Sequence, residues 1–325
     1  MKDVLIIGCG RIAGGYDEGR TDTVVRTHAK AFGGHPGFRL AACVEPDADR
    51  RHAFMEHWAI PEGAAELSAF THRPFAVACI AGPTHSHADV LHRLLDMDVA
   101  VTFAEKPLTD DLDEARALVA AFAERGKALV VNYLRRCDPA MAALQADIAA
   151  GCLGRLQGAV GLYTKGILNN GSHMVDLLQY LLGSLEPVSV DGALVDYLPE
   201  DPTLSCTLAA AGGATIRLLG LDRGHFTIFE LDLLFEKQRV RLTDSGFTIA
   251  RQDVVDAPLF DNYRVLAAPN AKLTQLDMAF AQAADAIFAH LNGGTPPVST
   301  GQTALAAQAV CARLIAMARE QERTP

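Results

Sequence analysis

The sequence lacks the features that mark several common classes of protein. It has no run of basic residues and its net charge is −10, which argues against a nucleic-acid-binding surface because phosphate binding depends on clustered Lys and Arg. No uninterrupted apolar segment is long enough to span a bilayer. The N-terminus also enters an apolar run without the pattern of a secretory signal. We therefore expect a protein with neither membrane nor nucleic-acid partners.

The cysteines form no recognisable pattern either. There are seven, an odd number, and none is spaced as Cys-x-x-Cys. This predicts a reduced, cytoplasmic protein with buried thiols and no metal site. His85 and His87 raise a metal site as an alternative, but no nearby carboxylate or thiol completes a ligand set, so a pair of loop histidines near a helix start is favoured.

The overall composition is that of a folded protein. Half of the 325 residues are hydrophobic and 21% are charged, which excludes disorder as the main state. This length allows two domains, each with its own core. No internal repeat or low-complexity tract is present.

The most informative stretch is a Gly-x-Gly-x-x-Ala turn after a short apolar run. Val4 to Ile7 reads as a parallel strand buried on both faces. Gly8 permits a tight turn, Gly10 lets the backbone approach a pyrophosphate, and Ala13 allows close helix–strand packing. The N–H groups of the following helix start would bind phosphates. Alone the signal is weak, because such a turn often only changes the direction of the chain.

A second dinucleotide-binding signal, an acidic residue, follows the next expected strand, Phe38 to Val44. Glu45 stands where the dinucleotide fingerprint has its ribose-binding acid. Its distance from Gly10 is longer than usual, and we assign the excess to a polar loop at 15–23. A solvated acid before Pro46 is the alternative.

Up to residue 132 the chain alternates apolar strands with helices. Further strands are expected at Ala76–Ala81, Val99–Phe103 and Ala128–Val131. Ser86 and Asp89 have the spacing of a capping box. The alternation predicts a doubly wound parallel sheet, and hence an α/β fold with an N-terminal Rossmann domain at 1–132 that binds a dinucleotide.

Beyond residue 133 the pattern changes. Consecutive β-rich runs from Val188 to Arg251 lack crossover helices, and clear helices return only at Leu273–Leu291 and Thr303–Ala318. This predicts a C-terminal α+β domain at 133–325 with an open, mainly antiparallel sheet, which would bind the substrate. The far face of such a sheet must be covered, so we expect a homodimer or homotetramer.

Five short motifs in a fixed order carry a family resemblance. The chain resembles the glucose–fructose oxidoreductase, inositol dehydrogenase and rhizopine-catabolism (Gfo/Idh/MocA) family, from Met1 to about Asp176 in motifs and thereafter in architecture only. The motifs are Gly8–Ala13, Glu45–Asp47, Gly82–Ala88, Glu105–Pro107 and Gly171–Asp176.

The resemblance implies NAD as cofactor. A carboxylate at Glu45 repels a 2′-phosphate, although Arg50 and Arg51 are close enough in sequence to leave NADP open. The residues expected to bind the cofactor are Gly8, Gly10, Arg11, Ile12, Glu45, Gly82, Pro83, Thr84, His87, Glu105 and Lys106.

The resemblance also implies that Lys106 touches the reacting hydroxyl and that the Lys106–Pro107 bond is cis. Partial desolvation and the positive charge of an oxidised nicotinamide should lower the pKa of this lysine toward the range of a general base. The alternative is a surface lysine that screens Glu105.

The second chemical motif departs from the family pattern. Similar proteins usually carry an aspartate where this chain has Asn169, and an amide cannot take a proton. The acid–base role then falls on His173, whose unperturbed pKa is near neutrality, or on Lys106. Asp176, one helical turn beyond His173, would orient the imidazole or only contribute to packing.

Other polar residues are candidate substrate contacts. Tyr163 and Lys165 lie at a strand end and are substrate contacts or plain surface. Arg135 or Arg136 would bind an anionic or polyhydroxyl ligand, or form a structural salt bridge.

Three functions are compatible with these motifs. The first is an NAD(P)-dependent oxidoreductase that transfers a hydride between nicotinamide and a secondary alcohol of a sugar, cyclitol or nucleotide sugar. The second is a redox-neutral lyase or glycoside-cleaving enzyme with tightly bound NAD, which Asn169 makes worth considering. The third is a non-catalytic, cofactor-binding regulator.

Overall fold

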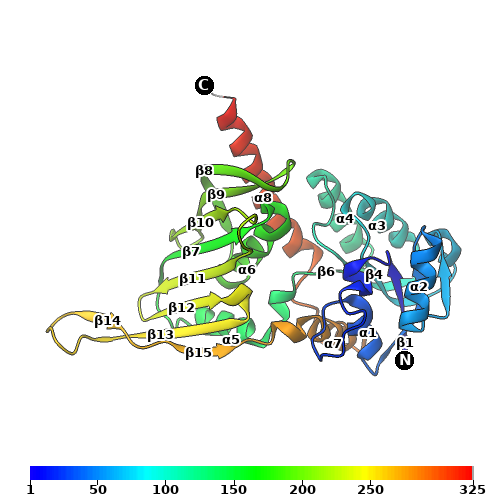
Figure 1. The fold of residues 1–325 in the computed structure, drawn as a ribbon, viewed down its shortest axis with the longest axis horizontal. Coiled ribbons are helices and arrows are strands. Elements are labelled where there is room, and N and C mark those ends of the chain that lie inside the picture. Colours follow the sequence, from blue (N-terminus) through cyan, green and yellow to red (C-terminus); the bar gives the residue numbers. More distant parts are fainter. Residues whose placement is uncertain (324–325) are drawn as a thin grey trace. The chain divides into compact units, whose positions relative to one another are not determined.

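The computed structural model describes residues 1–323, which divide into two compact units (Figure 1). Unit 1 contains residues 1–137 and 277–305, and unit 2 contains residues 138–276 together with the chain from residue 306 onward. The expected division at 132–133 placed the whole C-terminal part in one domain. The structure instead returns residues 277–305 to the first unit.

Unit 1 is built on a parallel sheet with the strand order β3-β2-β1-β4-β5-β6. Neighbouring strands pair in parallel throughout, as their continuous apolar sequences predict. This confirms the Rossmann-like domain. The strands are β1 (Lys2–Ile7), β2 (Phe38–Val44), β3 (Glu62–Ala64), β4 (Phe75–Ile80), β5 (Val99–Ala104) and β6 (Ala128–Val131).

Helices of unit 1 begin at polar caps. The side chains of Thr27, Asp47 and Asp111 each accept a hydrogen bond from a backbone N–H in the first turn of α1, α2 and α4. Ser86 makes no such bond at the start of α3, because its backbone is helical (φ −93°, ψ −10°) instead of extended as in a cap; its hydroxyl donates to the Pro83 carbonyl, and the expected capping box does not form. The helices are α1 (His28–Gly34), α2 (Ala48–Trp58), α3 (His87–Asp96) and α4 (Leu112–Glu124).

Helix α7 (Ala279–Leu291) explains why the late segment belongs to unit 1. Phe280 and Ile287 are buried in the same apolar cluster as Phe32 and Phe103. The expected helix start at Leu273 is not observed, because residues 270–273 form strand β15.

Unit 2 is built on a mixed sheet with the order β14-β13-β12-β11-β7-β10-β9-β8, in which β15 also pairs with β13 (Figure 1). Only β7 and β10 pair in parallel among these neighbours in the described chain. The expectation of a mainly antiparallel sheet is confirmed. The strands are β7 (Leu156–Thr164), β8 (Leu185–Leu198), β9 (Asp201–Ala210), β10 (Thr215–Leu221), β11 (Phe229–Phe235), β12 (Gln238–Thr243), β13 (Thr248–Asp256), β14 (Arg264–Leu266) and β15 (Asn270–Leu273).

The two faces of this sheet differ in burial. Side chains on one face, such as Leu218 and Leu231, are almost completely buried, while Leu219 and Leu234 on the opposite face are 44% and 38% exposed. Met174 of α6 lies against β7 on the buried face, since a Cβ added to Gly161 would meet its side chain. The helices of this unit are α5 (Pro139–Ala149), α6 (Ser172–Leu182) and most of α8 (Gly301–Glu322).

Two further expectations concern the cysteines and membrane-spanning segments. In the part of the chain that the structure describes, the cysteines are free, and most are buried, but Cys152 is exposed. Within the same residues, no helix combines the length and apolar character that a membrane span requires.

Candidate active site

The Gly-rich turn after β1 is shaped by a close approach to the loop after β4. Gly8 has a φ of +89°, and a Cβ added there would lie 2.6 Å from the Gly82 nitrogen, so only glycine fits. A Cβ added to Gly10 would meet nothing within 4 Å, which leaves its backbone open to a ligand. Residues Arg11–Gly15 form one short π-helical turn rather than a full helix. Its first N–H groups lack partners within the turn, as at any helix start, and suit phosphate oxygens.

Glu45 lies directly beside this turn. Its Oε2 accepts a hydrogen bond from the Cys9 N–H at 3.0 Å, and its Oε1 accepts one from the Asp47 N–H at 3.1 Å. The residue is only 6% exposed, so it is not a solvated acid. Arg50 lies 3.4 Å from the same carboxylate. The arrangement fits a dinucleotide because it places a fixed carboxylate at the end of β2, next to the turn that would hold the pyrophosphate.

His87 joins two loops at the carboxyl edge of the same sheet. Its Nδ1 lies 2.9 Å from the Pro107 carbonyl oxygen, and its Nε2 lies 3.1 Å from the Gly82 carbonyl oxygen. The residue is 1% exposed. Both ring nitrogens lie within hydrogen-bonding distance of backbone carbonyls, so His87 links the two loops, and its contact with the cofactor stays a prediction. No group of three potential metal ligands occurs among the described residues.

Glu105, directly after β5, forms a buried hydrogen-bonded network. Its Oε1 lies 3.0 Å from His28 Nε2 and also accepts a hydrogen bond from the Asn132 amide. Burial acts to raise the pKa of Glu105, but the hydrogen bond and charge of His28, the charge of Lys106 and the Asn132 amide together outweigh it. The pKa of Glu105 is therefore below its usual value, and the carboxylate stays ionised in the interior.

Lys106 follows this carboxylate at the end of the sheet. The Lys106–Pro107 peptide bond is cis, as expected. Thr84 begins the short helical turn between β4 and α3, and Pro83 directly precedes it. Arg135 lies in the turn Leu134–Cys137 that follows β6. All of these residues belong to unit 1.

The remaining predicted residues belong to unit 2. Asn169 lies in the π-helical turn Gly166–Gly171, and His173 and Asp176 lie in the first turns of α6. The Asn169 amide donates to the Lys165 carbonyl oxygen at 3.3 Å. Asp176 is 1% exposed, so its carboxylate lies in the packing beneath α6.

Tyr163 and Lys165 differ in how well they suit substrate binding. Tyr163 is fully buried; its hydroxyl donates to the Leu204 carbonyl at 2.7 Å and accepts from the Leu204 N–H at 2.8 Å. This corrects the expected substrate contact, because the hydroxyl is used within the core. Lys165 has a φ of +72°, and its ammonium lies 5.1 Å from the centre of the Tyr197 ring.

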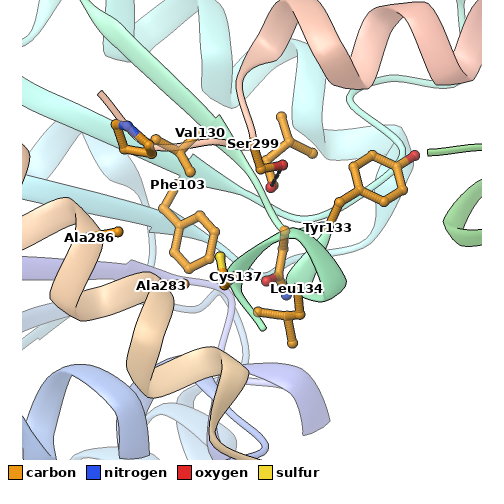
Figure 2. Close-up of a pocket in the computed structure, with 11 residues that line it drawn as sticks. Phe103, Val130, Tyr133, Leu134, Cys137, Ala283, Ala286 and Ser299 are labelled. Atoms are coloured by element: carbon orange, nitrogen blue, oxygen red, sulfur yellow. Dashed lines mark hydrogen bonds between the residues drawn. The ribbon is translucent and has the colours of Figure 1, made fainter. Parts of the chain in front are cut away.

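A cavity in unit 1 lies behind β5 and β6 and is not a ligand site. Figure 2 shows Phe103, Val130, Cys137 and Ala283 around it. Its volume is about 10 Å³, which admits at most one water molecule. It is a packing gap between the sheet and α7.

Comparisons with known proteins agree with this geometry. Residues 2–133 match the family described as "Oxidoreductase family, NAD-binding Rossmann fold". The myo-inositol dehydrogenase Hyg17 of Streptomyces leeuwenhoekii is 30% identical over 154 residues, which are 47% of this chain and only 43% of that relative. The inositol 2-dehydrogenase of Rhizobium meliloti (strain 1021) is 24% identical over 337 residues, with 94% of this chain and 93% of the relative covered.

A solved structure extends the likeness to both units. The WlbA dehydrogenase from Bordetella pertussis, in complex with NADH and UDP-GlcNAcA, has a TM-score of 0.82 at 18% identity, and the match covers 98% of this chain and 96% of that one. At this identity the likeness shows a shared fold. Fold and Gly-rich turn together agree with this match and identify residues 2–133 as an NAD-binding Rossmann domain of the oxidoreductase class. Within that class, residues 2–133 match the Gfo/Idh/MocA family.

His28 was not predicted from the sequence as part of this site. It opens α1, is 0% exposed, and contacts Glu105 across 77 positions of the chain. The available sequence signal was a histidine on the apolar side of a short helix, and such a residue is indistinguishable from a core histidine until its partner is known.

Proposed function

We propose that the protein oxidises a secondary alcohol of a sugar or cyclitol, or reduces the corresponding ketone, with NAD. The observation that carries the proposal is the buried Glu105 carboxylate, which His28 and Asn132 hold ionised immediately before Lys106. The names of the relatives, inositol dehydrogenases and a levoglucosan dehydrogenase, favour polyhydroxylated rings as substrates.

The protein's own groups handle the proton of the substrate hydroxyl. Bound NAD would supply the hydride acceptor. Lys106, anchored by the charge of Glu105, accepts the hydroxyl proton or holds the oxygen, and His173 takes or returns a proton at the same oxygen. Asn169 orients that oxygen by hydrogen bonding, since its amide donates and accepts but does not titrate. Glu45 holds the adenosine ribose and favours NAD over NADP.

The first experiment identifies the cofactor and the substrate together. The purified protein is denatured and any released dinucleotide is identified. The cofactor-free protein is then titrated with NAD and NADP, while the absorbance of reduced nicotinamide is followed against sugars, inositols and nucleotide sugars. Reduction of a freely exchanging cofactor by one compound establishes the dehydrogenase. A tightly held cofactor, with substrate consumed but no net reduction, would contradict the proposal and favour redox-neutral chemistry.

Lys106 gives the sharpest residue test. Lys106→Ala should lower kcat by about 10²- to 10⁴-fold, the usual contribution of a general acid–base group, while NAD still binds. Lys272→Ala, at an exposed position on β15, is the matched control and should keep wild-type turnover. Unchanged activity in the Lys106 variant would remove this lysine from the mechanism.

A further inference from the structure

The segment that leads into α6 is held by a carboxylate from another strand. Asp201, the first residue of β9, accepts a hydrogen bond from the Leu168 N–H at 2.6 Å through Oδ1 and from the Asn169 N–H at 2.9 Å through Oδ2. Asp201 is only 4% exposed. A charged acceptor facing two successive N–H donors fixes the direction of the backbone at Asn169.

Gly166 shows how tightly the segment lies against this carboxylate. Its φ is +77°, and a Cβ added there would lie 2.1 Å from Asp201 Oδ2 and 2.4 Å from its Cγ. Any larger residue would therefore displace either the segment or the aspartate. The close contact between Gly166 and Asp201 therefore forms only when the turn has this backbone conformation.

Two more side chains of the same hairpin bind the start of the segment. Asp196 of β8 accepts from the Lys165 N–H at 2.8 Å, and the Thr203 hydroxyl of β9 accepts from the Gly166 N–H at 2.6 Å. The Thr203 hydroxyl in turn donates to Asp196. The π-helical turn Gly166–Gly171 that leads into α6 receives no side-chain cap from its own N-cap residue, Lys165, so the hairpin β8–β9 supplies acceptors for the N–H groups at its start.

We propose that Asp201 is a positioning residue for the reaction: it fixes the turn so that Asn169 and, through the first turn of α6, His173 meet the substrate hydroxyl. The inference rests on the proposed function, in which these two side chains contact that hydroxyl. Asp201 does not itself exchange a proton with substrate, because it is buried and each of its oxygens accepts a backbone N–H.

Asp201→Asn tests the role, since the new amide places an NH₂ group against one of the two N–H donors. We expect kcat to fall about 10- to 100-fold, because a misplaced reacting group lowers the rate by roughly this factor. The Kd for NAD should stay unchanged. Hydrogen–deuterium exchange should accelerate in peptides that contain residues 165–171. The matched control is Asp191→Asn on β8, because Asp191 accepts hydrogen bonds from Ser189, Thr207 and Arg217, which all lie outside the turn. The Asp191→Asn variant should leave both kcat and the exchange rate of residues 165–171 unchanged.

Asp196→Asn is a milder second variant should Asp201→Asn fail to fold, and it should lower kcat in the same direction. Unchanged kcat in a folded variant, with or without faster exchange, would overturn the positioning role. If the wild-type protein reduces NAD with no compound of the panel, the proposed function fails and the positioning role fails with it. Faster exchange in Asp201→Asn would then still identify Asp201 as a structural anchor of the turn.

Discussion

At the scale of single residues, the ionised state of Glu105 links stability to pH. Its pKa in the folded protein is lowered, so its charge contributes stability above the unfolded value of about 4.3. This contribution is lost as the pH falls through the lower, folded value. The contribution of Glu105 to the stability of unit 1 should therefore be constant above its unfolded pKa and decline in acid.

His28→Phe should change both the size and the sign of this effect. A phenyl ring suits the contacts that His28 makes with Phe103 and Phe280, but Glu105 loses its main partner. Removing one partner of a buried pair costs about 3–5 kcal/mol. Burial then raises the pKa of Glu105, so the variant should lose stability as the pH rises through that value.

The measurement uses the chain's single tryptophan. Trp58 lies at the end of α2 and packs against the unit 1 core, so its fluorescence during urea unfolding reports on that unit. His72→Phe, at an exposed loop position, is the control and should follow the wild-type pH profile. An acid decline of unchanged steepness in His28→Phe would contradict the assigned role of Glu105.

At the scale of elements, α7 should stabilise unit 1 although it is far away in sequence. Ile287 is 0% exposed within the unit 1 core, and Ile→Ala at such a site costs about 2–5 kcal/mol. Ile287→Ala should therefore shift the Trp58 unfolding transition to lower urea concentration. Val298→Ala, at a position that is 46% exposed, should shift it little. Coincident transitions for the wild type and Ile287→Ala would show that α7 does not support this core.

Much of unit 1 could be predicted from local sequence, and the reason is physical. Continuous apolar runs such as Val4–Ile7 and Ala76–Ala81 report burial on both faces, which in a soluble domain occurs in parallel sheets. The turn at Gly8 and the acid at Glu45 have fixed places relative to these strands. The helix Ala48–Trp58 was not predicted, because its residues are mostly polar and only Phe54 is buried, so it lacks a clear apolar face.

The long-range contacts could not be predicted in the same way. An amphipathic helix such as α7 shows that one face is buried but not which core receives it. Tyr163 reads as a polar residue at a strand end, yet its hydroxyl meets Leu204, 41 positions away. The bond from Asn169 to Asp201 spans 32 positions and depends on the register of the β8–β9 hairpin.

At the scale of the whole molecule, the outer face of the unit 2 sheet is the surface that we propose joins copies of the chain. It carries a hollow of about 310 Å³ lined by Val160, Leu162, Asp232 and Arg241, among others. Leu219 and Leu234 are exposed on the same face. Apolar side chains among charged ones suit association with a second sheet.

The double variant Leu219→Arg/Leu234→Arg should therefore produce monomers. Each new arginine would place a charge without a partner in the contact between copies, and burying such a charge costs free energy in addition to the loss of apolar contact. Sedimentation would show the change in mass. Leu259→Arg, at a position outside the strands that is 83% exposed, should keep the wild-type assembly. An unchanged mass for the double variant would place the interface elsewhere.

The return of residues 277–305 to unit 1 also has a consequence for biosynthesis. A ribosome completes the Gly-rich turn and every strand of the parallel sheet long before it reaches Phe280 and Ile287, which fill the core beside Phe103. Until then, the nascent first unit exposes an apolar surface while the whole sheet of unit 2 is being translated. We expect a chain released after residue 276 to aggregate or be degraded, even though it contains all the residues expected to bind NAD.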